Sequence, residues 1–289
     1  MLTITTGAVV HADALAALRD VPPGSAGLVY ADPPFNTGRP RRGLRLRVAL
    51  DPDGGDRTGF AGRRYRSERL LLQQYPDSFD DYLGWLAPLL EESRRVLAPH
   101  GTLYLHLDPR ESHYCKLLLD QIFGRDHFLN ELVWAYDYGA RSTRRWSAKH
   151  DVILVYVRDR RAYHFDAAAV ERIPYMAPAL QRPDRAALGK LPTDVWWQTI
   201  VPTNSRERTG YPTQKPLAIL RRIIAASSRP GELVLDWCAG SGTTGVAAHQ
   251  LGRRFLLIDH GTDAVALMRR RLEDVPGLRC TASVSELLG

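Results

Sequence analysis

Residues 233–244 have the sequence Leu-Val-Leu-Asp-Trp-Cys-Ala-Gly-Ser-Gly-Thr-Thr, which is an apolar run followed by a glycine-rich turn. The apolar run predicts a buried strand that ends at Asp236. Gly240 and Gly242 permit a tight turn and let the backbone approach a ligand closely. A helix is expected at 243–250. A strand, a glycine turn and a helix in this order indicate a Rossmann-type nucleotide site.

The next strand, expected at 255–258, ends at Asp259. An acid at this position can accept hydrogen bonds from both hydroxyls of a ribose. The alternative is that Asp259 caps a helix expected at 262–273. No Gly-Lys-Ser or Gly-Lys-Thr follows the turn, so a P-loop for a triphosphate is excluded. We expect S-adenosyl-L-methionine (AdoMet), which has no pyrophosphate, rather than NAD.

The rest of the chain alternates between strand and helix patterns. Strands are expected at 2–10, 28–31, 101–108, 132–134, 152–157 and 279–284 in addition to those above. Helices are expected at 11–20, 79–97, 111–123 and 215–228, with Pro88 bending or splitting the second and Thr213 capping the last. This alternation predicts an α/β fold with a mostly parallel sheet and helices on both faces.

A second distinctive segment, Asp32-Pro33-Pro34-Phe35, follows the strand expected at 28–31. The prolines hold the backbone extended and expose its carbonyls beside the Asp32 carboxylate. Phe35 offers an aromatic face. Taken alone, these four residues favour a plain strand end and turn.

The positive charge of the chain is concentrated directly after this segment. Residues 39–70 contain ten arginines and four acidic residues, and the formal charge of the whole chain is +7. The segment has no helical periodicity, so we expect a long basic loop at 38–78 that binds a polyanion. The alternative is a solvated loop without a partner.

Other classes of protein are disfavoured. The three cysteines, Cys115, Cys238 and Cys280, fit neither a disulfide framework nor a zinc site, and no metal constellation is expected. No signal peptide and no membrane span are indicated. We therefore expect a cytoplasmic, nucleoid-associated protein.

The motifs and their order resemble the beta class of amino-group DNA methyltransferases. Asp32–Gly38 comes early and the turn at 236–244 late, which is the circularly permuted order of that class. Tyr211-Pro-Thr-Gln-Lys-Pro216 is similar to a family motif that usually begins with His, and Trp134 and 149–158 also match. The resemblance covers most of residues 5–275 and implies a Rossmann-like, seven-stranded, mostly parallel sheet.

The resemblance implies a site-specific DNA methyltransferase with AdoMet as cofactor and S-adenosylhomocysteine as product. It assigns the catalytic role to Asp32, Pro33, Pro34 and Phe35. The implied cofactor residues are Asp13, Asp32, Thr213, Lys215, Asp236, Cys238, Ala239, Gly240, Ser241, Gly242, Thr243, Thr244 and Asp259. The arginines expected to bind DNA are Arg39, Arg41, Arg42, Arg63, Arg64 and Arg66.

Within one methyltransferase domain, we expect a catalytic half at 1–158, a small target-recognition region at 159–210 and an AdoMet-binding half at 211–289. Family members with Asp at the first motif position mostly methylate N6 of adenine, so adenine in double-stranded DNA, flipped out of the helix, is the preferred substrate. Methylation of cytosine N4 is the alternative. RNA or protein-glutamine methylation, or a DNA-binding relic without activity, is more distant. The small recognition region suggests a homodimer.

Overall fold

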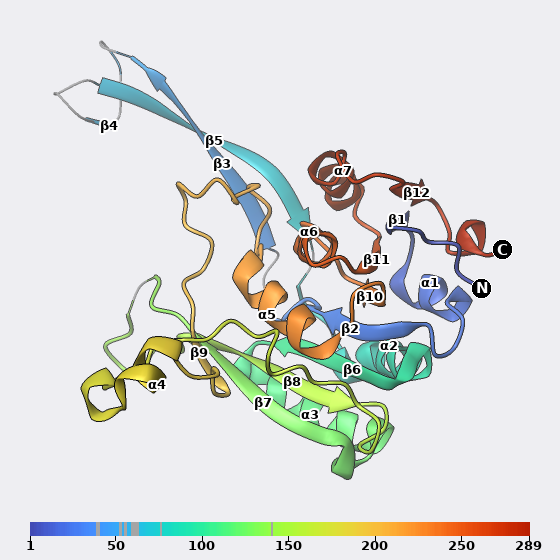
Figure 1. Cartoon of the computed structure of the whole chain (residues 1–289). Coiled ribbons are helices and arrows are strands. Elements are labelled where there is room, and N and C mark those ends of the chain that lie inside the picture. The colour runs from blue at the N-terminus through green and yellow to red at the C-terminus, as the bar shows by residue number, and fades with distance from the viewer. Residues whose placement is uncertain (39–40, 52–53, 55–56, 59–63, 76, 140) are drawn as a thin grey trace.

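The computed structural model describes residues 1–289 except 39–40, 52–53, 55–56, 59–63, 76 and 140. Within these residues, nine strands form one large sheet (Figure 1). In sheet order they are β12 (Arg279–Thr281), β1 (Gly7–His11), β11 (Arg254–Asp259), β10 (Leu233–Asp236), β2 (Ala26–Ala31), β6 (Leu97–Leu107), β8 (His150–Val157), β7 (Phe128–Ala135) and β9 (Val195–Trp197).

The sheet is mostly parallel, as the sequence predicts. The strands from β12 to β6 are parallel, β8 runs antiparallel to both of its neighbours, and β9 is parallel to β7. The number of strands is nine, however, and not seven. Eight of the nine strands overlap stretches in which the sequence predicts a strand, including β12 at the predicted 279–284. The strand that was not predicted is the edge strand β9, whose three residues lack the apolar run that reveals a central strand.

Helices cover both faces of the sheet and enclose two hydrophobic cores. One core contains residues of α1 (Ala14–Asp20), α2 (Tyr82–Val96) and α3 (Pro109–Phe123). The other contains residues of α5 (Leu217–Ser227), α6 (Thr243–Gln250) and α7 (Thr262–Arg271). Consecutive strand residues point to opposite faces, so Val9 lies in the second core and Val10 in the first. Among the described residues, no helix combines the length and apolarity needed to cross a membrane.

The helix predicted at 79–97 is the single helix α2, which continues through Pro88 without splitting, and bending at this proline stays a prediction. The residue that meets the proline ring, Gly84, has no side chain and is exposed, so the carbonyl left without its helical partner can be hydrated. Thr213 does not cap α5, which begins at Leu217 after Pro216. Its φ of 60° is left-handed instead, an uncommon conformation for threonine.

The basic segment is a β-hairpin and not a loop. Strands β3 (Arg41–Leu50) and β5 (Arg64–Tyr75) pair antiparallel, and the short β4 (Arg57–Thr58) adds to β5. Figure 1 shows this hairpin projecting from the body of the protein, and we call it the arm. The sequence signal was the alternation of apolar residues with others at 44–50, Leu-Arg-Leu-Arg-Val-Ala-Leu, which has the two-residue period of a strand.

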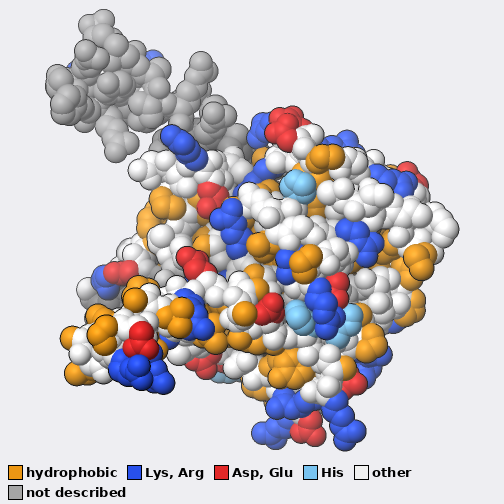
Figure 2. Space-filling model, viewed as in Figure 1, with side chains coloured by type: hydrophobic (Ala, Val, Ile, Leu, Met, Phe, Trp, Pro, Cys, Tyr) orange, Lys and Arg blue, Asp and Glu red, His pale blue; other side chains and the backbone are white. Residues whose placement is uncertain are grey.

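The region at 159–210 is largely irregular. It contains a short α4 (Pro183–Leu188), 3₁₀ turns and the edge strand β9. Met176, Leu180 and Leu188 are exposed here, and Figure 2 shows hydrophobic side chains gathered over α4 and its surroundings.

Candidate active site

The carboxyl ends of three neighbouring strands bring the sequence motifs together. Strand β2 ends directly before Asp32, β10 ends at Asp236 and β11 ends at Asp259. In the sheet these strands lie in the order β11, β10, β2. Motifs about 200 residues apart in the chain therefore meet at one edge, where ligands bind in open α/β sheets.

The glycine turn is held in a conformation that requires glycine. Gly240 and Gly242 have φ values of 50° and 76°. A Cβ atom at Gly240 would lie 2.9 Å from the ring of Tyr211, and one at Gly242 would lie 2.8 Å from Met268. Tyr211, which departs from the usual family His, thus packs directly on the turn.

The spacing of the turn does not distinguish AdoMet from NAD. Gly245 stands three residues after Gly242, so the turn has the full spacing of the dinucleotide fingerprint. A Cβ at Gly245 would lie 2.7 Å from Leu257, so this glycine allows α6 to pack closely on β11. The cofactor has to be inferred from the rest of the site.

Asp236 and Asp259 hold the turn from two sides. Asp236 is buried and accepts hydrogen bonds from the Thr244 hydroxyl at 2.5 Å and from the Cys238 amide at 3.1 Å. Its burial raises the pKa of the carboxyl to about 7, although these hydrogen bonds act in the opposite direction. Asp259 accepts one hydrogen bond from the Gly240 amide and one from the Gly261 amide, both at 2.8 Å.

Asp32 forms an ion pair with Lys215. The lysine Nζ lies 2.6 and 2.7 Å from the two carboxylate oxygens, and it also lies 4.7 Å from the centre of the Phe35 ring. The backbone amide of Asp32 donates to the Sγ of Cys238 at 3.1 Å. Burial raises the pKa of the Cys238 thiol well above its ordinary value, so the sulfur carries its proton. Through these contacts Asp32 is fixed to both the glycine turn and the segment at 211–216.

A cavity of about 480 Å³ opens between these segments. It is lined by all of the sequence-predicted cofactor residues except Gly242. Asp13 lines it too, while its carboxylate caps α1 by accepting from the Ala16 amide at 2.9 Å. Apolar side chains, including Phe79, Trp85 and Leu89, complete the walls. This size, with apolar walls and a few charged groups, fits a nucleoside with a polar tail.

A second cavity of about 360 Å³ lies on the other side of the catalytic segment. Asp32 and Pro34 line the first cavity, Phe35 lines the second, and Pro33 lines neither. The two cavities share four wall residues, which are Tyr211, Thr213, Gln214 and Lys215.

Sequence reasoning missed several residues of the second cavity. Tyr136, Tyr138, Asp151 and Arg208 line it, and Trp134 was noted only as a family marker. These residues come from β7 and the segment that follows it, from β8 and from the irregular region, so only the fold brings them to one place.

Four of the six predicted DNA-binding arginines lie in the strands of the arm. Arg39 and Arg63 are outside the described residues, and Arg41 and Arg42 begin β3 at the base of the arm. Arg64 and Arg66 are exposed, and they lie toward the end of the arm that β4 joins. The Arg66 guanidinium lies 2.9 Å from the Asp51 carboxylate. The outer arginines are therefore carried away from the catalytic segment and not placed beside it (Figure 1).

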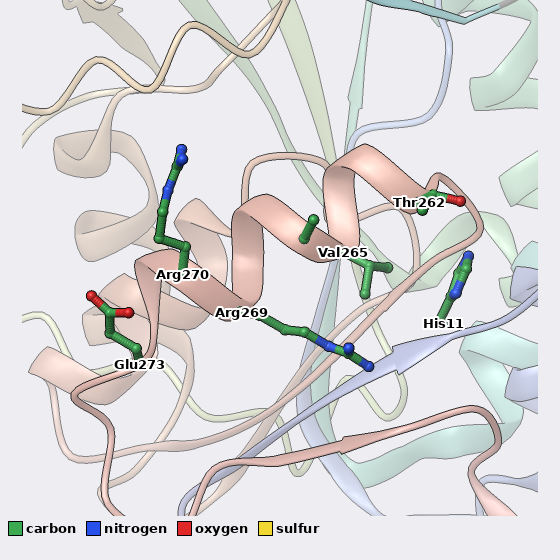
Figure 3. Close-up of a pocket in the computed structure, with 7 residues that line it drawn as sticks. His11, Thr262, Val265, Arg269, Arg270 and Glu273 are labelled. Carbon is green, nitrogen blue, oxygen red and sulfur yellow. The ribbon is translucent and has the colours of Figure 1, made fainter.

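A shallow hollow between His11 and α7 is separate from this site. It is lined by Arg269 and Glu273, among others, but by none of the sequence-predicted site residues. Figure 3 shows the Arg269 side chain extending toward the strand of His11, whereas Arg270 points to the other side of the helix. No cluster of His, Cys, Asp and Glu suited to a metal ion occurs in the part of the chain that the structure describes.

Comparison with known proteins identifies the family. Residues 26–270 match the family described as DNA methylase, which comprises N6- and N4-methyltransferases. The chain belongs to this family of DNA methyltransferases. The match confirms the resemblance inferred from the motifs, with DNA as substrate and AdoMet as the cofactor of the family.

Individual relatives are similar over most of the chain. The DNA adenine methyltransferase YhdJ of Escherichia coli K12 is 31% identical over 273 residues, and the alignment covers 92% of this chain and 82% of the relative. Type II methyltransferase M.HpaI of Haemophilus parainfluenzae is 29% identical over 264 residues, and the alignment covers 91% of this chain and 73% of the relative. The crystal structure of the M1.HpyAVI–SAM complex shares the fold, with a TM-score of 0.59 and 19% identity. The superposition covers 92% of this chain and 99% of that one.

Proposed function

We propose that this methylase transfers a methyl group from AdoMet to the exocyclic N6 of adenine, at a specific site in duplex DNA. The observation that carries the proposal is the position of Asp32-Pro33-Pro34-Phe35 between two adjoining cavities. One cavity suits the cofactor and the other suits the base. The reacting groups would meet at the segment that separates them.

Asp32 has the chemistry to activate an amine. The nitrogen of an exocyclic amine is a poor nucleophile because its lone pair is delocalised into the ring. A carboxylate that accepts one N–H, with a backbone carbonyl of the proline pair accepting the other, draws the nitrogen toward tetrahedral geometry. A carboxylate has about four acceptor sites, so Asp32 can accept this N–H while it stays paired with Lys215. Positioning and electrostatics supply the rate without a covalent intermediate.

The cavity of about 480 Å³ fits AdoMet on observations of its own. Asp259 faces it with a carboxylate suited to ribose hydroxyls, and Lys215 and Thr213 can face the carboxylate of the methionine part. Asp13, Asp236, Cys238 and the turn at 239–244 complete the proposed cofactor site. Bound AdoMet supplies an activated methyl group at its sulfonium.

The second cavity is suited to a flipped base. A base inside a duplex is out of reach, and extruding it costs a few kcal/mol. Phe35, Trp134 and Tyr136 give the cavity aromatic walls on which a base can stack. The arginines of the arm would contact DNA phosphates and help to offset that cost.

Each part of the chain has a proposed role. Residues 1–158 form the catalytic half with the basic arm, and 211–289 form the AdoMet-binding half. The region at 159–210 contributes to target recognition, with its exposed apolar and arginine side chains. We also propose that two copies act together as a homodimer on chromosomal DNA at the nucleoid, as part of a restriction–modification system or alone.

The choice of adenine rests on Asp32 as the first residue of the motif and is supported by the name of the E. coli relative. To test it, the protein is incubated with labelled AdoMet and unmethylated duplex DNA of mixed sequence, and the digested nucleosides are identified by mass spectrometry. N6-methyladenine is expected. N4-methylcytosine would overturn the base assignment and retain the mechanism. AdoMet binding without any methylated nucleoside would contradict the proposed function.

A further inference from the structure

A buried chain of hydrogen bonds joins the walls of the two cavities. The Tyr30 hydroxyl, which lines the first cavity, lies 2.8 Å from Nδ1 of His106. Nε2 of His106 lies 3.0 Å from Oδ2 of Asp151. The Tyr136 hydroxyl, in the second cavity, donates to Oδ1 of Asp151 at 2.9 Å. His106 is completely buried and Asp151 is 7% exposed.

The charges in this chain of groups can be assigned. Burial alone would raise the pKa of the Asp151 carboxyl, but the hydrogen bond and charge of His106, together with Lys215 and Tyr136, hold it below its ordinary value. Asp151 is therefore an ionised hydrogen-bond acceptor. Nε2 of His106 must then carry a proton and donate the hydrogen bond to the Asp151 carboxylate. Burial raises the pKa of Tyr30 well above its ordinary value, so this hydroxyl keeps its proton.

The aromatic walls of the second cavity rest on this pair. The Phe35 ring stacks on the His106 ring with centroids 6.1 Å apart and planes at 30°. Trp134 packs edge-on against His106 at 5.5 Å and against Tyr136 at 5.2 Å. Asp151 therefore fixes one wall by its hydrogen bond to Tyr136, and fixes His106, on which Phe35 and Trp134 lie.

We propose that Asp151 is a positioning residue for the target base. Its carboxylate orients Tyr136 directly, and Phe35 and Trp134 through His106, so that the second cavity is already shaped when the base enters. This proposal deepens the proposed function, because it takes the second cavity as the site of the flipped base. A carboxylate is required, since only an acceptor with two free oxygens satisfies both the imidazole N–H and the phenol O–H. An asparagine would present an N–H₂ to one of these donors.

The test compares Asp151→Asn and Tyr136→Phe with the wild-type protein. Tyr104→Phe is the matched control, because it deletes a buried tyrosine hydroxyl that bonds Ser227 and lines neither cavity. The readouts are AdoMet affinity by calorimetry, kcat and KM for DNA, and the fluorescence of 2-aminopurine placed at the target position of a duplex. Circular dichroism and the melting temperature report folding.

Asp151→Asn should lower kcat/KM for DNA by about ten- to hundredfold, as expected for the removal of a hydrogen bond to a charged group. The 2-aminopurine signal of base flipping should fall, whereas the AdoMet affinity of this variant should stay within about twofold of wild type. Tyr104→Phe should stay within about twofold of wild type in all of these readouts. Tyr136→Phe removes one of the two bonds and should give a smaller fall of the same kind.

Two outcomes would overturn the inference, and they are distinguishable. If the wild-type protein methylates DNA and both variants match it in kcat/KM and in 2-aminopurine fluorescence, Asp151 has no positioning role and the proposed function stands. A wild-type protein that binds AdoMet but neither flips nor methylates any base in duplex DNA would remove the proposed function, and this inference with it. Should Asp151→Asn fail to fold, Tyr136→Phe decides alone.

Discussion

Asp32 belongs to two environments at once, because its carboxylate pairs with Lys215 while its amide donates to Cys238. Asp32→Ala should reduce methyl transfer by on the order of 10²–10³-fold, since the acceptor for the amine N–H is removed. AdoMet binding should be retained, measured by calorimetry alongside single-turnover methylation. Asp120→Asn is the control, because Asp120 pairs with Lys116 at 2.7 Å and lines neither cavity. Full activity in Asp32→Ala would contradict the mechanism.

Asp236 gives a prediction about pH. Burial raises its pKa to about 7 from an ordinary value of 3.8, so the folded protein holds this proton to a higher pH than the unfolded chain does. Its contribution to stability is therefore greatest at low pH and falls as the pH rises to about 7. Asparagine does not titrate, so Asp236→Asn removes this pH-dependent loss of stability. Relative to wild type, its free energy of unfolding should increase by up to about 4 kcal/mol between about pH 4 and pH 8.

Urea titrations at several pH values measure this difference. Asp120→Asn provides the opposite case, because hydrogen bonds from Lys116 and Tyr156 outweigh desolvation and hold the pKa of Asp120 below its ordinary value. That variant should lose stability relative to wild type as the pH rises to about 4, and the difference should stay constant at higher pH. Parallel pH curves for Asp236→Asn and wild type would refute the assigned burial effect.

At the scale of elements, we propose that the arm binds DNA phosphates away from the site of methyl transfer. Arg64→Gln with Arg66→Gln should weaken duplex binding and lower the salt dependence of log K by about 0.9 for each phosphate that the arm no longer neutralises. AdoMet affinity should not change. The control changes two exposed arginines elsewhere, Arg19 and Arg125, to glutamine. Fluorescence anisotropy at several salt concentrations measures the duplex affinity and its salt dependence. Equal effects in the two double variants would rule out a specific role for the arm.

The elements also show why some of the fold was legible and some was not. The strand, turn and helix at 233–250 were correctly predicted, because an apolar run beside glycines has few other interpretations. The arm was missed because the segment was interpreted from its charge and the alternation at 44–50 was overlooked, and β9 because three residues form no period. The pair His106–Asp151 was beyond prediction, since it depends on β6 lying next to β8. A sequence contains no local signal for that neighbour relation.

For the whole molecule, the small region at 159–210 leaves limited surface for recognising a target sequence. We therefore expect two copies to bind one DNA site. Sedimentation equilibrium at micromolar concentration, with and without duplex DNA, should show two chains per particle in at least one of these conditions. The protein mass is then near twice the 32.4 kDa of one chain, after the mass of any bound duplex is subtracted. A mass of one chain per duplex, and of one chain without DNA, would refute the dimer.

The segment at 211–215 forms a wall of both cavities, and Thr213 within it has a left-handed φ of 60°. Any shift of this segment when one cavity fills changes the free energy of filling the other. Thermodynamic reciprocity then requires the two effects to be equal: the factor by which DNA alters the dissociation constant of the cofactor is the factor by which the cofactor alters that of DNA. With such a shift, the shared wall would make the methylase a coupled pair of receptors, in which neither affinity is a property of one ligand alone.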